Sequence, residues 1–248
     1  MREVDARASI KRFLCGELPI LSFWEIYESD PEIDRFLQQI VDNIKAQGGE
    51  MKPVAKKHPA TGEVTRSVGI TKYLLTPELD PGLRYGSPPR FGSVHQLLHY
   101  HHNMVTYDVH TASGALNFYG AVYELFCQID DTVAYDDRYL QAYDFALEVI
   151  PDYLSGGEAE QYIQQHILPL YPDSMKKTER KKRIKAAIHA AFPSEKGRPC
   201  WAQSSQWPFG KDGRPATYLG KGKSDGDLRR WRFRDESTGE IIIVEQWL

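Results

Sequence analysis

The stretch that decides the fold class is residues 228–247, LRRWRFRDESTGEIIIVEQW. In its first seven residues Trp231 and Phe233 alternate with arginines, and a period of two places the two sets on opposite faces of a strand. Residues 241–247 form a second candidate strand. The DESTG segment between them ends in Gly239, which tolerates the positive φ of a hairpin loop. The stretch therefore predicts an antiparallel hairpin with a buried aromatic face and solvated arginines.

The hairpin predicts a small sheet at the C-terminal end of the chain. Residues 218–221 supply a further strand, which gives a meander of three or four strands over residues 196–248. A sheet of this size is marginal as an independent unit. We therefore expect it to pack on helices and to share one core with them through the tryptophans of this region, Trp201, Trp207, Trp231 and Trp247.

The chain before Phe192 has helical periodicity. Asp30 is a suitable N-cap, Pro31 suits the first helical position, and apolar residues then recur at i, i+3, i+4 and i+7 up to Ala46. Similar patterns predict helices over residues 6–15, 20–28, 111–129, 136–150, 158–168 and 174–191, and one from Ser93 that carries Met104. The segment 50–92 is rich in proline and glycine and predicts loops with short strands at 63–68 and 73–75.

These patterns together predict the α+β class. The expected organisation is a mostly helical N-terminal body over residues 1–195, with a loop-rich insert at about 50–92, and a small antiparallel β subdomain over residues 196–248 at the C-terminus.

Composition limits the class of protein further. The chain has 248 residues, of which 41% are hydrophobic, and a net charge of −3, so it can bury a core without disulfides or metals. No apolar run approaches the ~20 residues of a membrane span, and the charged N-terminus lacks the apolar core of a signal peptide. The three cysteines are odd in number and far apart. We therefore expect a cytoplasmic protein without disulfides and without a membrane partner.

Charge is segregated along the chain. Residues 108–160 hold one base, Arg138, against eleven acids: Asp108, Glu124, Asp130, Asp131, Asp136, Asp137, Asp144, Glu148, Asp152, Glu158 and Glu160. Concentrated negative charge attracts cationic partners and repels nucleic acid. The alternative is an acidic helical face that is solvated and offset by the basic run at residues 176–185.

The histidines suggest a second class of function. His95, His99 and His102 are spaced i, i+4 and i+7, which would place them on one face of a helix, and His101 and His110 lie close by in the sequence. Two histidines one turn apart are the spacing of a helical zinc site. Gln96 and Leu97 stand where a metallohydrolase would carry its general base. A metal-dependent hydrolase that uses the His95–His110 cluster therefore stays an alternative, while the main expectation is no metal, no cofactor and no catalysis.

The basic C-terminal third suggests a third class, a nucleic-acid-binding regulator. It would use the lysines and arginines of residues 176–185 and the arginines of residues 229–234, with Trp231 and Phe233 stacking on bases. Strand alternation argues against this use, because it assigns both aromatic rings to the core. The acidic block argues against a nucleic-acid partner as well.

The two ends of the chain resemble a known class of protein. The N-terminal motifs are Phe13-Leu14-Cys15-Gly16-Glu17-Leu18, Phe23-Trp24 and Asp30-Pro31-Glu32. The C-terminal motifs are Trp201-x-Gln203, Trp207-Pro208, Asp212-Gly213-x-Pro215, Phe233-Arg234-Asp235, Thr238-Gly239 and Glu245-Gln246-Trp247. Over about a third of the chain these resemble immunity proteins of bacterial polymorphic toxin and contact-dependent growth inhibition systems.

The resemblance implies a non-catalytic, cytoplasmic bacterial protein that binds one cognate toxin and blocks its active site. Because many such toxins attack nucleic acids and carry basic clefts, an acidic surface could mimic the phosphate backbone and fill the cleft. On this hypothesis we expect the partner-binding residues to be Asp130, Asp131, Tyr135, Asp136, Asp137 and Tyr139, with the tyrosines as rigid anchors.

Overall fold

The computed structural model describes residues 3–57, 61–75, 91–102 and 105–248. Its contacts divide the chain into two compact units, Met1–Tyr143 and Asp144–Leu248, called here unit one and unit two. The sequence had placed the change from helices to strands at residue 196. The boundary between the two units lies earlier, inside a helix. The helices that follow this boundary belong to unit two because they pack with the C-terminal sheet. Helices and small antiparallel sheets together make an α+β protein, as predicted.

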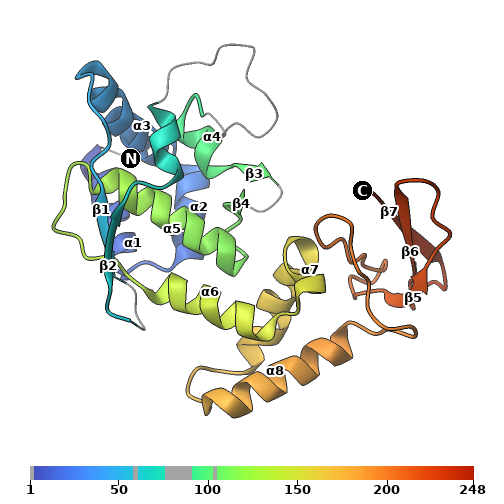
Figure 1. The fold of residues 1–248 in the computed structure, drawn as a ribbon. Coiled ribbons are helices and arrows are strands. Elements are labelled where there is room, and N and C mark those ends of the chain that lie inside the picture. Colours follow the sequence, from blue (N-terminus) through green and yellow to red (C-terminus); the bar gives the residue numbers. More distant parts are fainter. Residues whose placement is uncertain (1–2, 58–60, 76–90, 103–104) are drawn as a thin grey trace. The chain divides into compact units, whose positions relative to one another are not determined.

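Unit one is a helical body (Figure 1). Its described α-helices are α1 Glu3–Leu14, α2 Ile20–Ser29, α3 Pro31–Ala46, α4 Val94–Leu98, α5 Ala112–Phe126 and the first half of α6 Arg138–Val149. In α3 the side chain of Asp30 accepts a hydrogen bond from the Glu32 N–H, and Pro31 occupies the first turn. The apolar stripe from Ile33 to Val41 is buried. The helix predicted for this segment is thereby confirmed.

Helix α5 is the centre of unit one. Eleven of its fifteen residues are buried, and it contacts both α1 and α3. Thr111 caps the helix by accepting from the Gly114 N–H. A Cβ at Gly114 would lie 1.8 Å from the carbonyl oxygen of Asp108, so only glycine allows the preceding loop to cross this turn.

The insert of unit one contains more regular structure than its sequence predicts. The described elements are β1 Val54–Lys57, β2 Val64–Ser67 and the 3₁₀ helix η1 Ile70–Leu74, and beyond the insert, after α4, lie the short strands β3 His101–His102 and β4 Val105–Thr106. Strand β2 confirms the prediction at 63–68, and it pairs antiparallel with β1, which was missed. The strand predicted at 73–75 is wrong, because that segment continues a 3₁₀ helix.

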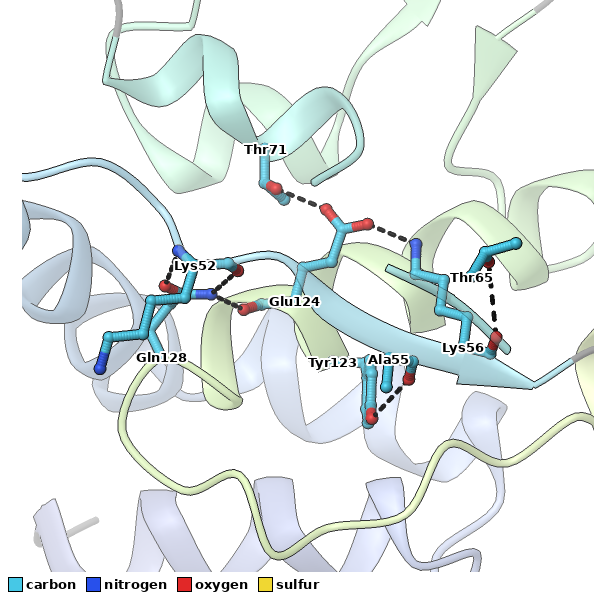
Figure 2. A network of polar contacts seen from close by, with 8 residues as sticks. All are labelled: Lys52, Ala55, Lys56, Thr65, Thr71, Tyr123, Glu124 and Gln128. Carbon is cyan, nitrogen blue, oxygen red and sulfur yellow. Dashed lines mark hydrogen bonds and ion pairs between the residues drawn. The ribbon is translucent and has the colours of Figure 1, made fainter. Parts of the chain in front are cut away.

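A buried carboxylate attaches the insert to α5, as Figure 2 shows. Glu124 is 3% exposed, and its two oxygens contact Lys56 Nζ and Thr71 Oγ1, each at 2.5 Å. Two further residues, Tyr123 of α5 and Gln128 just after its end, also form hydrogen bonds with the insert. Gln128 exchanges hydrogen bonds with the main chain of Lys52, and the hydroxyl of Tyr123 donates to the carbonyl of Ala55. Polar contacts therefore fix the ribbon β1–β2 on the helical body.

Unit two begins with helical turns. Its elements are the 3₁₀ helices η2 Asp152–Leu154 and η4 Leu168–Leu170, α7 Gly157–Tyr162, the π-helical η3 Ile163–Ile167, and α8 Lys177–Ala191. In α8 the buried positions are Ile184 and Ile188, which fit the predicted amphipathic face. Helix α8 packs against η3, where Ile163 and Ile167 are buried.

The rest of unit two is a three-stranded antiparallel sheet of order β5-β6-β7. Its strands are β5 Thr217–Lys221, β6 Leu228–Arg234 and β7 Ile241–Trp247. The pairing of β6 and β7 runs without interruption from Leu228↔Trp247 to Arg234↔Ile241. Gly239 closes the hairpin with a φ of +75°. The three strands and the hairpin predicted from the sequence are confirmed.

The inner face of the sheet forms the core of unit two. Trp207 and Trp231 are each 2% exposed and Phe233 is fully buried. Phe192, directly after α8, packs edge-on against Trp207 with ring centroids 5.4 Å apart. The sheet therefore shares a core with the helices next to it in sequence. Trp247 was expected in this core and is 62% exposed, because its position in β7 faces the other side of the sheet.

The motifs at the C-terminal end hold the sheet and its loops together. Gln246 is buried, and its side-chain oxygen accepts from the N–H groups of Ala202 and Gln203. Asp235 is also buried and accepts from the Ser237 hydroxyl and the Lys211 N–H, which hold the pKa of its carboxyl well below the usual range. These residues therefore have architectural roles.

Two tryptophans offer a matched test of this core. Trp207 Nε1 donates to the carbonyl of Ala216 at 2.9 Å, whereas Trp231 Nε1 has no hydrogen-bond partner in the described part of the chain. We expect Trp207→Phe to cost about 1–3 kcal/mol more stability than Trp231→Phe, because only the former leaves a buried carbonyl unpaired. Urea unfolding of both variants measures the difference. Equal losses would contradict the prediction.

Candidate partner-binding loop

The predicted partner-binding residues lie in and next to the loop over residues 127–137, between α5 and α6. We call this segment the α5–α6 loop. It follows the buried end of α5 and leads into α6, so both of its ends belong to regular helices. Asp130, Asp131, Tyr135, Asp136 and Asp137 lie within it, and Tyr139 is in the first turn of α6.

Asp130 fixes the first half of this loop. Its Oδ1 accepts from the N–H of Thr132 at 3.2 Å and from the Thr132 hydroxyl at 2.5 Å. Its Oδ2 lies 3.1 Å from Lys11 Nζ and 3.6 Å from Arg7, both on α1. The Thr132 hydroxyl and Lys11 lower the pKa of Asp130 to about 2, so the carboxylate stays ionised at neutral pH. Asp130 is therefore a structural residue of the loop.

The second half of the loop is held by tyrosines of α5 and by Asp136. The Asp136 N–H donates to the hydroxyl of Tyr119 at 2.7 Å, and the Tyr123 hydroxyl donates to the carbonyl of Val133 at 3.4 Å. The carboxylate of Asp136 forms an ion pair with Arg138 at 2.5 Å. The loop is thus anchored at several positions, and these contacts within unit one define its conformation.

Two carboxylates of the loop face solvent without a counter-ion among the residues that the structure describes. Asp131 is exposed and forms no ion pair there. Asp137 is half-buried and accepts only from the neutral amide of Gln141, at 2.9 Å. In the same loop, Ile129 is 44% exposed, although it is a large apolar side chain. The sequence prediction did not include Ile129.

The structure corrects the role assigned to Tyr139. This side chain is 8% exposed and packs among the rings of Phe13 and Tyr119, so it belongs to the core of unit one. Tyr135 is half-buried, edge-on to Tyr119 and Tyr123, and burial raises its pKa to about 12. Neither ring projects as an isolated anchor. Both rings instead pack against other aromatic side chains of unit one.

Ion pairs neutralise four of the eleven acids of residues 108–160, three of them with bases from other parts of the chain and one with Arg138 of the same segment. The pairs are Glu124 with Lys56, Asp130 with Lys11, Asp136 with Arg138, and Glu148 with Lys181. The net charge of residues 108–160 therefore overstates the negative charge that this segment presents to a partner. Within the loop, the negative charge without a counter-ion among the described residues is that of Asp131 and Asp137.

The histidines do not share one helix. Ser93 caps α4 as predicted, by accepting from the Gln96 N–H, but α4 ends at Leu98. The prediction of one helix that carries Met104 is wrong, because the chain turns into the antiparallel pair β3–β4, and Met104 itself lies outside the described residues. His102 is thus in a strand, while His110 is exposed in the loop before α5.

His99 is the histidine with the most defined surroundings. Its Nδ1 lies 2.9 Å from the carbonyl of His95, and its Nε2 lies 2.7 Å from a carboxylate oxygen of Glu28. These two contacts occupy both ring nitrogens of His99, one with a main-chain carbonyl and one with a carboxylate. Among the described residues no group of three or more histidine, cysteine, aspartate or glutamate side chains could hold a metal ion.

About half of the basic side chains in the C-terminal third form ion pairs, eight of the seventeen lysines and arginines over residues 161–248. The pairs are Arg230–Glu245, Arg234–Glu195, Lys177–Glu148, Lys181–Glu148, Arg183–Glu179, Arg180–Asp173, Lys211–Glu240 and Arg214–Asp212. Trp231 and Phe233 are in the core, as strand alternation predicts, so neither ring is placed to stack on a nucleic-acid base.

Comparison of the chain with protein-family models, with curated proteins and with solved structures gives no match. Within the described ranges, none of the helices has the length and apolar character needed to cross a bilayer.

Proposed function

We propose that this chain is an immunity-type protein that binds a cognate bacterial toxin and neutralises it by covering the toxin's active site. The observation that carries the proposal is the α5–α6 loop, which is fixed by contacts to α1 and α5 and contains the exposed Ile129 and two carboxylates, Asp131 and Asp137, that have no counter-ion among the described residues. The resemblance of the two chain ends to immunity proteins supports the same class. The three free cysteines support action in the reducing cytoplasm.

The physical properties of the loop suit a protein partner with a basic cleft. A segment that is already ordered loses little conformational entropy on binding, so more of the interaction energy appears as affinity. Unpaired carboxylates accelerate the approach of a cationic surface and fix its orientation. Burial of the exposed Ile129 side chain against the partner would add an apolar contact to the interface. No cofactor is required for this mechanism.

The proposal predicts that a gene beside this one encodes a large secreted protein with a toxic C-terminal domain, and the test uses that domain. Co-expression with the wild-type chain should restore growth of cells that make this domain. The double variant Asp131→Lys with Asp137→Lys should bind about 100-fold more weakly, or about 3 kcal/mol, because lysines would then face the basic cleft. Surface plasmon resonance at several salt concentrations should assign most of the loss to slower association, since long-range attraction is screened by salt.

The matched control is the double variant Glu50→Lys with Glu63→Lys. Both glutamates are exposed in unit one, and the net charge changes by the same amount. This control should bind like the wild type. Equal weakening by both double variants would show that only overall charge matters and would overturn the assignment of the loop. Failure of the wild-type chain to protect cells would overturn the proposed function itself.

A further inference from the structure

Strand β7 is an edge strand whose outer side is open for pairing. It pairs with β6 alone in the sheet order β5-β6-β7. Two hydrogen bonds at the ends of this strand pair show which residues of β7 bond to β6. The Asp235 N–H donates to the Glu240 carbonyl, and the Leu248 N–H donates to the Asp227 carbonyl. Even-numbered residues of β7 therefore direct their main-chain groups toward β6, and odd-numbered ones direct theirs outward. We call the outward groups of Ile241, Ile243, Glu245 and Trp247 the β7 edge.

The β7 edge is almost unoccupied in the part of the chain that the structure describes. One contact reaches it, from the Gln203 side-chain amide to the carbonyl of Trp247 at 3.0 Å. Three of its four side chains are apolar and exposed, with Ile241 at 43%, Ile243 at 56% and Trp247 at 62%, and the fourth is the carboxylate of Glu245. The strand has no proline, no lysine and no bulge, which are the features that protect natural edges from pairing. An edge of this kind favours the addition of another strand.

A second β7 strand complements this edge in shape and polarity. When two copies run antiparallel with Val244 opposite Val244, Trp247 of each copy lies opposite Ile241 of the other, an aromatic and β-branched pair. Glu245 then lies opposite Ile243 of the other copy. Every outward main-chain group from 241 to 247 also meets an outward group, because odd residues oppose odd residues in this register.

Charge favours the same register. Arg232 lies opposite Ile243 in the β6–β7 pairing and is exposed, without an ion pair among the described residues. In the paired copies, Glu245, which forms an ion pair with Arg230 of its own chain, would lie about 10 Å, or two strand spacings, from Arg232 of the other copy. This spacing is within the combined reach of the two side chains, so Glu245 would be shared between the two arginines. We propose that two copies of this chain associate through their β7 edges in this register to form a continuous six-stranded sheet.

The experiment is sedimentation equilibrium of the full chain from low to high micromolar concentration. The wild type should show twice the chain mass at high concentration. Ile243→Lys should weaken the dimer more than about tenfold, since a charged side chain at the centre of an edge opposes pairing. Arg232→Glu should weaken it as well, because it would then repel Glu245 of the other copy. Thermal unfolding of both variants should match that of the wild type.

Val64→Lys is the matched control. Val64 is 56% exposed, as is Ile243, and lies in β2 of unit one. This variant should dimerise like the wild type. A monomer at all concentrations would overturn the proposal, as would a dimer that Ile243→Lys and Arg232→Glu leave intact. Equal losses for Ile243→Lys and Val64→Lys would also overturn it, since they would indicate non-specific apolar association. None of these outcomes depends on binding of a toxin.

Discussion

A chain that ends at residue 195 is expected to be insoluble, because it lacks the sheet that covers the helices of unit two. Phe192 is fully buried and packs on Trp207, while Tyr162 packs on Phe209 with ring centroids 5.5 Å apart. Each large apolar side chain left in water forfeits about 1.5–3 kcal/mol. Truncation would therefore expose an apolar surface that promotes aggregation. The soluble fraction after expression, together with dye binding by any soluble remainder, measures this effect.

Removal of Leu248 alone is the control for this truncation. Leu248 is 68% exposed, so its loss uncovers no core. This variant should remain soluble and unfold like the full chain. A soluble, monomeric fragment over residues 1–195 that unfolds cooperatively would show that the sheet is not needed by the helices.

The second large effect is expected at Glu124. Glu124→Gln preserves the size of the side chain and removes the charge that faces Lys56, whose side chain is 25% exposed. Breaking a buried pair from one side costs about 3–5 kcal/mol. We expect about 3 kcal/mol, the lower end of this range, because Lys56 keeps some contact with solvent. Urea unfolding with a common slope gives the loss of stability.

Two further variants make this prediction specific. Glu17→Gln removes one partner of the exposed pair with Arg12 and should change stability by less than about 0.5 kcal/mol. Glu124→Gln combined with Lys56→Met should cost less than the sum of the single changes, since no charge is then left uncompensated. If Glu124→Gln unfolds at the same midpoint urea concentration as the wild type, the stabilising role of this carboxylate is contradicted.

The elements that the sequence predicts well are those whose signal is local. Asp30, Pro31 and the apolar stripe that follows define α3 within seventeen residues. Strand β6 is predicted by alternation alone, because a period of two assigns Trp231 and Phe233 to one face. Strand β1 was missed because Pro53 and two lysines weaken its strand pattern. Its pairing with β2 also joins residues on opposite sides of a loop, which local sequence does not indicate.

The candidate loop was found from its acids, but their roles could not be assigned from the sequence. The spacing of Asp130 and Thr132 is typical of a turn in which the aspartate accepts from the residue two positions later, and this signal was present. The ion pair of Asp130 with Lys11 joins residues 119 positions apart, which no local pattern indicates. For this reason the sequence did not distinguish Asp131 and Asp137, which have no counter-ion among the described residues, from Asp130 and Asp136, which form ion pairs.

The sequence by itself thus determined the α+β class, helix α3, the three C-terminal strands and the buried face of the hairpin. All of these depend on periodicity and capping over a few neighbouring residues. Only the tertiary structure decided that the boundary between the two units lies inside α6, that Tyr139 is a core residue, and that Glu124 is neutralised by Lys56, 68 positions away. Burial and ion pairing are properties of segments that meet in space, and local sequence does not specify which segments meet.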